Sequence, residues 1–187
     1  MQAGGGFQVR VEGISFAAAH FATFKGGCEP LHGHNYDVAA VVEGALADDS
    51  WVYDFVELKT IVRGFCRELD HRFMLQRDSR VLKIEERVGA WAIQTPAGNE
   101  YLLPAPDVIL LPIDNTTAER LAEWLCVRLC QTLAERGADN ITAIVVEVAE
   151  GPGQRASHRL ERLPVEQAKM NNAWSGTKLN PGQVRRV

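Results

Sequence analysis

Residues Cys28-Glu29-Pro30-Leu31-His32-Gly33-His34 bring a thiol, a carboxylate and two imidazoles into one short stretch. Successive side chains of a β-strand point to opposite faces, so His32 and His34 share a face if this stretch enters a strand. Two imidazoles that project side by side can bind one metal ion, and His20 lies upstream as a source of a third nitrogen. The stretch therefore predicts a metal site, and the rest of the chain can be interpreted around it.

Alternating apolar residues lie on both sides of this stretch. Residues 7–19 alternate loosely and change parity at Gly13, which predicts a strand with a bulge at the glycine. That strand delivers His20 at or just past its end. Residues 21–30 are rich in glycine and proline and predict a loop. Residues 34–46 alternate again, so a second strand is expected to begin beside the two other histidines.

Two amphipathic helices are predicted further along the chain. Asp54 and Glu57 form an N-terminal capping box for the first, which precedes apolar residues spaced three and four apart. Thr116 and Glu119 form the same motif for the second helix, and Gly137 ends it. Both helices have one apolar stripe, so each is expected to cover one face of a sheet.

The segment 76–112, between the two helices, contains several short β patterns. Residues 139–149 form a last strand that is apolar on both faces, and the segment after about Pro164 has no periodic pattern, which favours a mobile tail. Paired strands and grouped helices predict an α+β fold with an antiparallel sheet, in a single domain over 1–187. Within the inserted segment, short strands are predicted at residues 81–85, 91–94, 101–103 and 107–111.

The composition is that of a soluble globular protein. The chain has 187 residues, of which 46% are hydrophobic and 24% charged, and its net charge is −4. This charge leaves no electrostatic footprint for nucleic acid or an anionic membrane. No apolar run approaches the roughly 18 residues that span a bilayer, and the first residues do not resemble a signal peptide. We therefore expect a cytoplasmic protein, with its cysteines reduced.

Two neighbouring residues in the opening stretch can carry acid–base chemistry. Cys28 can act as a nucleophile, a general base or a fourth metal ligand, because a nearby metal or imidazolium lowers a thiol pKa; alternatively it is an inert loop thiol. Glu29 can be a second acid–base group or a solvated loop carboxylate. Cys126 and Cys130, four apart on the second helix, are buried apolar residues or contribute to a separate metal site.

Further candidates lie at the ends of the predicted elements. Asp70 and His71 follow the first helix and form either an acid–base pair or a helix terminus in which the imidazole interacts with the helix dipole. Glu119 has a sufficient structural role in its capping box. Glu147 interrupts an apolar strand, and a buried carboxylate needs partners, such as the paired N–H donors of an aminopyrimidinone. Alternatively, Glu147 lies at a strand end and faces water.

Together these motifs resemble the 6-pyruvoyl-tetrahydropterin synthase / 6-carboxytetrahydropterin synthase family. They occur in the family's order and cover most of residues 7–150. The matching motifs are Phe16-x-Ala18-Ala19-His20, Cys28-x-x-x-His32-Gly33-His34, Val52-x-Asp54-Phe55-x-x-Leu58-Lys59, Leu69-Asp70-His71, Thr117-x-Glu119 and Val146-Glu147.

The resemblance implies the tunnelling fold, in which an antiparallel sheet carries two helices on one face, three subunits form a barrel and two trimers stack into a homohexamer. It implies active sites between subunits and 7,8-dihydroneopterin triphosphate as the substrate. The implied residue roles are zinc binding by His20, His32 and His34, acid–base chemistry by Cys28, Asp70 and His71, and anchoring of the pterin ring by Glu147 with Thr117 and Glu119.

The spacing between the cysteine and His-Gly-His resembles the branch that makes 6-carboxy-5,6,7,8-tetrahydropterin for queuosine synthesis. A folate-related branch has Glu-x-x-His-Gly-His and makes 6-hydroxymethyl-7,8-dihydropterin. This chain reads Cys-Glu-x-x-His-Gly-His, so it resembles members that carry out both reactions, with Glu29 in the second role. The alternatives are 6-pyruvoyl-tetrahydropterin synthase activity and a non-catalytic pterin-binding protein. The segment 76–112 and the tail are longer than is usual in the compact bacterial members.

Overall fold

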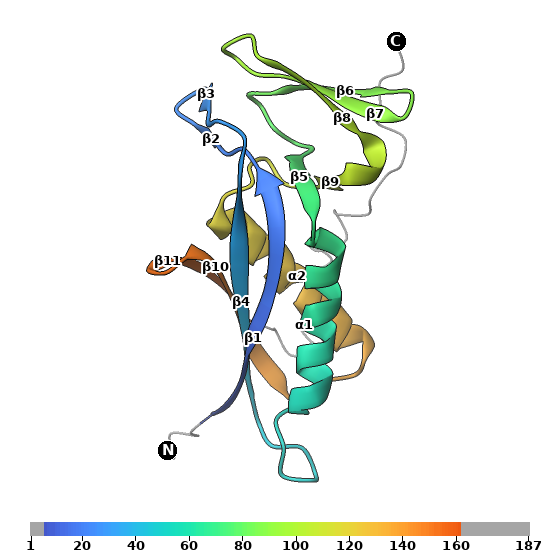
Figure 1. Cartoon of the computed structure of the whole chain (residues 1–187). Coiled ribbons are helices and arrows are strands. Elements are labelled where there is room, and N and C mark those ends of the chain that lie inside the picture. Colours follow the sequence, from blue (N-terminus) through green and yellow to red (C-terminus); the bar gives the residue numbers. More distant parts are fainter. Residues whose placement is uncertain (1–5, 162–187) are drawn as a thin grey trace.

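The computed structural model describes residues 6–161, in which two helices pack against one face of a six-stranded sheet (Figure 1). The predicted mobile tail after about residue 164 lies outside the described residues. No helix among the described residues is long and apolar enough to cross a membrane. The elements are β1 Phe7–His20, β2 Thr23–Phe24, β3 Gly27–Cys28, β4 His32–Gly44, α1 Phe55–Leu69, β5 Arg72–Gln76, β6 Lys83–Arg87, β7 Ala90–Gln94, β8 Glu100–Pro104, a 3-10 turn Ala105–Asp107, β9 Val108–Leu111, α2 Ala118–Glu135, β10 Ile141–Gly151 and β11 Gln154–Glu161.

The main sheet has the strand order β11-β10-β4-β1-β5-β9. The four strands from β11 to β1 pair antiparallel, which confirms the predicted α+β class. The short strands β5 and β9 pair in parallel at one edge, a feature that the sequence patterns did not predict. Strand β11 was not predicted either, because five of its eight residues are exposed and its apolar residues are few.

The predicted bulge in β1 is confirmed. The pairing of β1 with β4 shifts between Val11 and Ile14, and Gly13 adopts a φ of +67°, in the left-handed region that favours glycine. Because of this shift, the same face of the strand meets the core on both sides of the bulge. Val11 and Ile14 are therefore both buried, although they lie three residues apart. Beyond the bulge, the register pairs His20 with His32, which brings the ends of the two strands together.

Helix α1 begins as predicted. The Asp54 carboxylate accepts a hydrogen bond from the Glu57 backbone N–H at 2.7 Å, and the apolar stripe of the helix is buried against the sheet. Helix α2 begins one residue later than expected: Thr117, and not Thr116, caps it by accepting from the Arg120 N–H. Thr116 turns inward and is fully buried, and Glu119 is exposed. The proposed capping box of Thr116 and Glu119 is therefore wrong.

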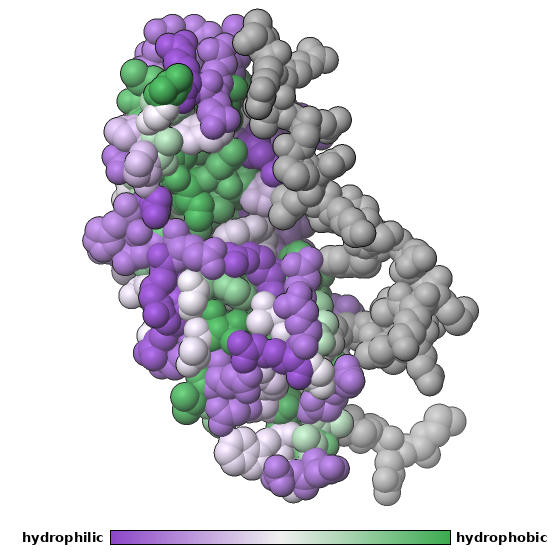
Figure 2. Space-filling view, turned by 90° about the vertical axis from the view of Figure 1, so that its right-hand side faces the viewer, coloured by the Kyte–Doolittle hydropathy of each residue, from purple (hydrophilic) through white to green (hydrophobic). Residues whose placement is uncertain are grey.

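The segment 76–112 forms the predicted β-rich insert. Strands β6, β7 and β8 make an antiparallel meander at one end of the molecule, and β9 rejoins the main sheet beside β5 (Figure 1). A second small core, separate from the main one, joins the insert to neighbouring parts of the chain, and apolar side chains remain visible on the molecular surface below the insert (Figure 2). The buried residues of this second core are Phe21, Phe73, Leu75, Leu82, Ile93 and Val108.

The two faces of the main sheet differ in chemistry. The face toward the helices carries the main apolar core, which includes Tyr36 and Ile144. The opposite face carries ion pairs that cross between strands: Arg10 binds Glu147, and Arg159 binds Glu43 with both of its terminal nitrogens. These two ion pairs make the face opposite the helices polar, so this face does not form a second apolar core.

Candidate metal and substrate site

Three histidines meet where β1 ends and β4 begins. The His20 ring centroid lies 4.7 Å from that of His32 and 5.2 Å from that of His34, and the two β4 rings are 4.9 Å apart. One nitrogen from each ring can be chosen so that all three lie within 4.8 Å of one another. The structure therefore brings the predicted three-histidine cluster together. Among the described residues, no other group of potential metal ligands lies this close together, and Cys126 and Cys130 belong to none.

Hydrogen bonds determine which ring nitrogen of two histidines is free to bind a ligand. His20 Nδ1 donates to the Thr116 carbonyl at 3.0 Å, and His32 Nδ1 donates to the Pro30 carbonyl at 2.7 Å. A carbonyl only accepts, so each Nδ1 carries a proton, and in the neutral form of each ring the lone pair lies on Nε2. His20 Nε2 is buried without a hydrogen-bond partner among the described residues. An unpartnered buried lone pair of this kind fits a metal ligand.

The electrostatic environment keeps His20 neutral. Burial, followed by the charge of His32, lowers the pKa of His20 to about 4. Neutral imidazole is the form that coordinates metals, and three imidazoles with an open fourth position are a common catalytic zinc set. The residues present therefore fit a zinc ion.

A pocket of about 310 Å³ opens beside the histidines. Its lining includes the predicted residues Glu29, Thr117 and Glu119 together with His20 and His32, and it also includes Glu150, which the sequence analysis did not select. Glu119 reaches it because α2 begins at Ala118, so the first turn of the helix forms one wall. The site thus combines potential metal ligands with several carboxylates.

Cys28 lies next to this pocket but does not line it. Its thiol is half-buried, packs against the second hydrophobic core and lies 3.4 Å from the Glu29 carbonyl. Burial, and to a lesser degree Glu29, raises the pKa of Cys28. The sequence suggested that the pKa of the Cys28 thiol is lowered. In the chain without a bound metal it is raised instead. Glu29, one residue later, faces the pocket.

Asp70 and His71 form the predicted pair but lie apart from the pocket lining. The Asp70 carboxylate accepts from the Ala17 backbone N–H at 2.8 Å and lies 3.0 Å from His71 Nδ1. The Ala17 N–H, followed by His71, lowers the pKa of Asp70. The His71 side chain is 82% exposed, and its φ of 57° is rare for a residue other than glycine. An exposed imidazole held in a strained conformation is available to a ligand or to another protein copy.

Glu147 is not brought to the pocket. Both of its carboxylate oxygens bind Arg10, at 3.0 and 2.8 Å, and Arg155 lies 3.4 Å away. The Arg10 guanidinium holds the pKa of Glu147 below its usual range. Its neighbours Val146 and Val148 face the helices, so Glu147 faces the opposite side of the sheet. The carboxylate thus already has cationic partners, and the role of Glu147 as a ring anchor stays a prediction.

Glu150 is the carboxylate that the sequence analysis missed. It follows Val146 and Val148 at alternate positions, so it lies on the helix side of β10 and lines the pocket. Burial raises its pKa, while His34 acts in the opposite direction. Continuing the apolar alternation of this strand by two residues would have found it, because the next position on that face carries a carboxylate.

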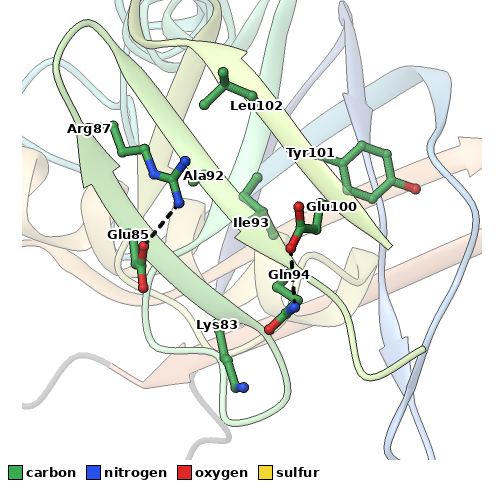
Figure 3. Close-up of a pocket in the computed structure, with 9 residues that line it drawn as sticks. All are labelled: Lys83, Glu85, Arg87, Ala92, Ile93, Gln94, Glu100, Tyr101 and Leu102. Carbon is green, nitrogen blue, oxygen red and sulfur yellow. Dashed lines mark hydrogen bonds and ion pairs between the residues drawn. The ribbon is translucent and has the colours of Figure 1, made fainter. Parts of the chain in front are cut away.

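A second hollow, of about 450 Å³, lies on the insert and is separate from the candidate site. Figure 3 shows it over strands β6, β7 and β8, lined by side chains such as Lys83, Ile93 and Leu102. Two of its polar contacts, between Arg87 and Glu85 and between Gln94 and Glu100, are satisfied within the insert. None of the predicted site residues lines this hollow.

Comparisons with known proteins agree with the geometry. A family model for 6-pyruvoyl tetrahydropterin synthase matches residues 8–161. A Methanocaldococcus jannaschii protein provisionally named 6-carboxy-5,6,7,8-tetrahydropterin synthase is 37% identical over 148 residues, which make up 79% of this chain and 90% of that protein. Dihydroneopterin monophosphate aldolase of Pyrococcus furiosus is 45% identical over 58 residues, or 31% of this chain and 49% of the aldolase.

Solved structures support the same assignment. The 6-pyruvoyl tetrahydropterin synthase of Plasmodium vivax superposes with a TM-score of 0.80 at 33% identity, over 84% of this chain and 99% of that one. One structure of that enzyme is a catalytic-residue mutant in which alanine replaces a glutamate. The predicted fold and enzyme class are therefore confirmed. This chain belongs to the 6-pyruvoyl tetrahydropterin synthase family and is a lyase of that type.

Proposed function

We propose that the chain is a zinc-dependent lyase that converts 7,8-dihydroneopterin triphosphate to 6-carboxy-5,6,7,8-tetrahydropterin, the queuosine precursor. The observation that carries the proposal is the convergence of His20, His32 and His34 beside a pocket lined with carboxylates. The Methanocaldococcus jannaschii relative, by its name, supports this product.

The metal assignment rests on the ligand set. Three imidazoles without a carboxylate favour Zn²⁺ over the hard ions Mg²⁺ and Ca²⁺, which prefer oxygen ligands. Bound zinc supplies Lewis acidity that makes nearby substrate hydroxyls easier to deprotonate. The protein's own part is to bury His20 in its neutral form and to orient the rings, and the backbone carbonyls of Thr116 and Pro30 orient two of the three ligands.

Glu150 takes the anchoring role that the sequence analysis gave to Glu147. Its carboxylate is half-buried, and the pKa raised by burial indicates that charge at this position lacks compensation in the free protein. An aminopyrimidinone ring offers paired N–H donors to such a carboxylate and supplies that compensation. Thr117 and Glu119 line the same pocket and contribute further polar contacts to the ring.

Glu29 is the acid–base residue that the pocket favours. It can accept the proton of a side-chain hydroxyl while the adjacent carbon–carbon bond breaks and its electron pair moves into the dihydropterin ring. This placement favours a second candidate reaction, formation of 6-hydroxymethyl-7,8-dihydropterin. The catalytic glutamate of the Plasmodium vivax enzyme and the similarity to an aldolase support it. Cys28 then serves the carboxytetrahydropterin reaction, for which it requires a lower thiol pKa than the free chain provides.

Asp70 and His71 complete the site from another subunit in this proposal. The pair is ordered by Ala17 and exposed away from the pocket lining of its own chain, as a residue that serves a neighbouring copy would be. A cytoplasmic homohexamer built from two trimers, as the family resemblance implies, is the assembly that we propose. The free thiols of Cys28, Cys66 and Cys126 are compatible with a reducing compartment.

Product analysis of three proteins tests the proposal. Wild-type protein, Cys28→Ala and Glu29→Ala are each incubated with 7,8-dihydroneopterin triphosphate, and the pterins are separated by chromatography. We expect Cys28→Ala to lose 6-carboxytetrahydropterin and Glu29→Ala to lose 6-hydroxymethyl-7,8-dihydropterin. Equal loss of both products in both variants contradicts the division of roles. Binding of the pterin by wild-type protein without any product identifies a non-catalytic binding protein, and a pyruvoyl product identifies the 6-pyruvoyl branch.

A further inference from the structure

Three of the buried polar residues of the described chain are linked in a row, with Thr116 bonded to His20 on one side and to Gln76 on the other. Gln76 and Thr116 are fully buried, and His20 is 1% exposed. Buried polar side chains are costly unless they are hydrogen-bonded, so a cluster of three needs an explanation. Only His20 belongs to the three-histidine cluster, and the proposed function gives no role to Gln76 or to the Thr116 side chain.

Hydrogen bonds connect the three residues to one another and to the backbone carbonyls of Phe21 and Thr116. Gln76 Nε2 donates to the Phe21 carbonyl at 3.1 Å. The Thr116 hydroxyl can donate to the same carbonyl at 3.3 Å or to Gln76 Oε1 at 3.5 Å, and its oxygen lies 3.3 Å from His20 Nδ1. The Thr116 carbonyl accepts from His20 Nδ1 at 3.0 Å. The network therefore fixes the backbone on both sides of the imidazole, at Phe21 and at Thr116.

Gln76 also stands at the base of the insert. It is the last residue of β5 and pairs with Leu111, the last residue of β9. The next residue, Arg77, donates its backbone N–H to the Leu111 carbonyl at 2.9 Å. The chain thus leaves the main sheet for the insert and returns from it directly beside the network that holds His20.

We propose that Gln76 and Thr116 are positioning residues that hold His20 with its Nδ1 protonated and its Nε2 directed to the metal, which makes the base of the insert part of the metal site. This inference rests on the proposed metal site. Hydrogen-bonded partners behind a metal ligand typically change metal affinity by about 10- to 100-fold. Because Gln76 is hydrogen-bonded to Phe21 and Thr116, its effect is expected to reach His20 through these two residues.

Zinc affinity of matched variants tests the inference. Gln76→Leu and Thr116→Val remove the side-chain hydrogen bonds at similar volume, and Thr116→Ser keeps the hydroxyl. Thr95→Val is the control, because Thr95 is also buried and its hydroxyl accepts from the Asn99 N–H, but within the insert. Zinc affinity is measured by competition with a chromophoric chelator, and the visible spectrum of the Co²⁺-substituted proteins reports the ligand geometry.

We expect zinc to bind about tenfold more weakly to Gln76→Leu and Thr116→Val, with an altered Co²⁺ spectrum, and to bind Thr116→Ser and Thr95→Val within about threefold of wild type. Wild-type affinity and spectrum in both Gln76→Leu and Thr116→Val overturn the inference. If the wild-type protein itself binds no zinc, the proposed metal site fails instead, so the two failures are distinguishable.

A measurement on the wild-type protein tests the inference even if the variants fail to fold. In metal-free wild-type protein labelled with ¹⁵N-histidine, NMR correlations between ring nitrogens and ring protons identify which nitrogen carries the proton. We expect His20 to be neutral with Nδ1 protonated. A His20 signal with Nε2 protonated overturns the inference, whatever the variants do.

Discussion

Glu147 and Glu150 lie three residues apart on β10 and face opposite sides of the sheet. Glu147 is bound by Arg10 through two hydrogen bonds, and its pKa is lowered. Glu150 lies beside the histidines, half-buried, and burial raises its pKa. One carboxylate is satisfied by its own chain, and the other has unmet hydrogen-bonding capacity. This difference favours ligand binding on the helix side of the sheet, where the buried His20 Nε2 and Tyr36 hydroxyl have no hydrogen-bond partner among residues 6–161.

The largest effect is expected from the helix side. His32→Ala removes a ligand that the Pro30 carbonyl orients, so zinc content measured by mass spectrometry of the purified metalloprotein falls well below that of wild type. Turnover falls by at least about 100-fold, the upper end of the loss when only a residue behind a ligand is removed, because a two-imidazole set no longer holds the ion in place. His158→Ala, on β11 and outside the cluster, is the control. Full zinc content in His32→Ala contradicts the assigned ligand set.

The two carboxylates themselves give the next effect. Glu150→Gln removes the charged acceptor proposed for the pterin ring, and a hydrogen bond to a charged group is worth about 1.5–3 kcal/mol, or roughly 10- to 150-fold in kcat/KM. Glu147→Gln is the matched control, with the same substitution on the same strand, and is expected to change kcat/KM less than about threefold. Steady-state kinetics check both. A larger loss for Glu147→Gln reverses the assignment of the two faces.

The pH dependence of stability separates the same pair in the metal-free protein. The raised pKa of Glu150 means that its contribution to the free energy of unfolding is present below the ordinary carboxyl pKa and is lost as the pH rises through the folded value. The lowered pKa of Glu147 means that its contribution is present above the ordinary value and is lost as the pH falls through the folded value.

Urea unfolding from about pH 3.5 to about pH 7, at fixed protein concentration, measures this difference. Relative to wild type, Glu150→Gln becomes more stable as the pH rises. Glu147→Gln becomes less stable over the same range, by no more than about 1 kcal/mol, because Glu147 is partly exposed to solvent. Parallel curves for the two variants contradict the opposite environments of these carboxylates.

The smallest effect is expected from the other ion pair of the outer face. Arg159→Gln removes two hydrogen bonds to Glu43, but the arginine is largely exposed, so screening by solvent leaves little net stabilisation. We expect a small fall in the unfolding midpoint that disappears at about 1 M salt, and unchanged turnover. A loss of turnover comparable with that of Glu150→Gln would mean that the outer face binds substrate.

The metal cluster could be predicted because its pattern is local. His32 and His34 share a face of any strand that contains them, whatever that strand pairs with. The position of His20 depended on a register that the sequence does not reveal, since the bulge at Gly13 determines how β1 meets β4. The sequence pattern correctly predicted the bulge and the end of β1 near His20. The register between β1 and β4 became clear only from the structure.

The errors arose where local patterns were ambiguous. The last long strand is apolar on both faces, so alternation alone did not show which face met the helices, and Glu150, just beyond the predicted end of the strand, was missed. Thr116 and Thr117 are adjacent and chemically alike, and burial of Thr116 against His20 decided which one caps α2. The parallel pairing of β5 with β9 joins short strands separated by the whole insert, which no local pattern encodes.

Turnover by one wild-type preparation, first stripped of metal and then restored with zinc, tests the central claim most directly. We expect that the stripped protein does not convert 7,8-dihydroneopterin triphosphate and that equimolar zinc restores formation of 6-carboxytetrahydropterin or 6-hydroxymethyl-7,8-dihydropterin. Equal turnover before and after zinc is restored, or no turnover by protein shown to hold zinc, would contradict it.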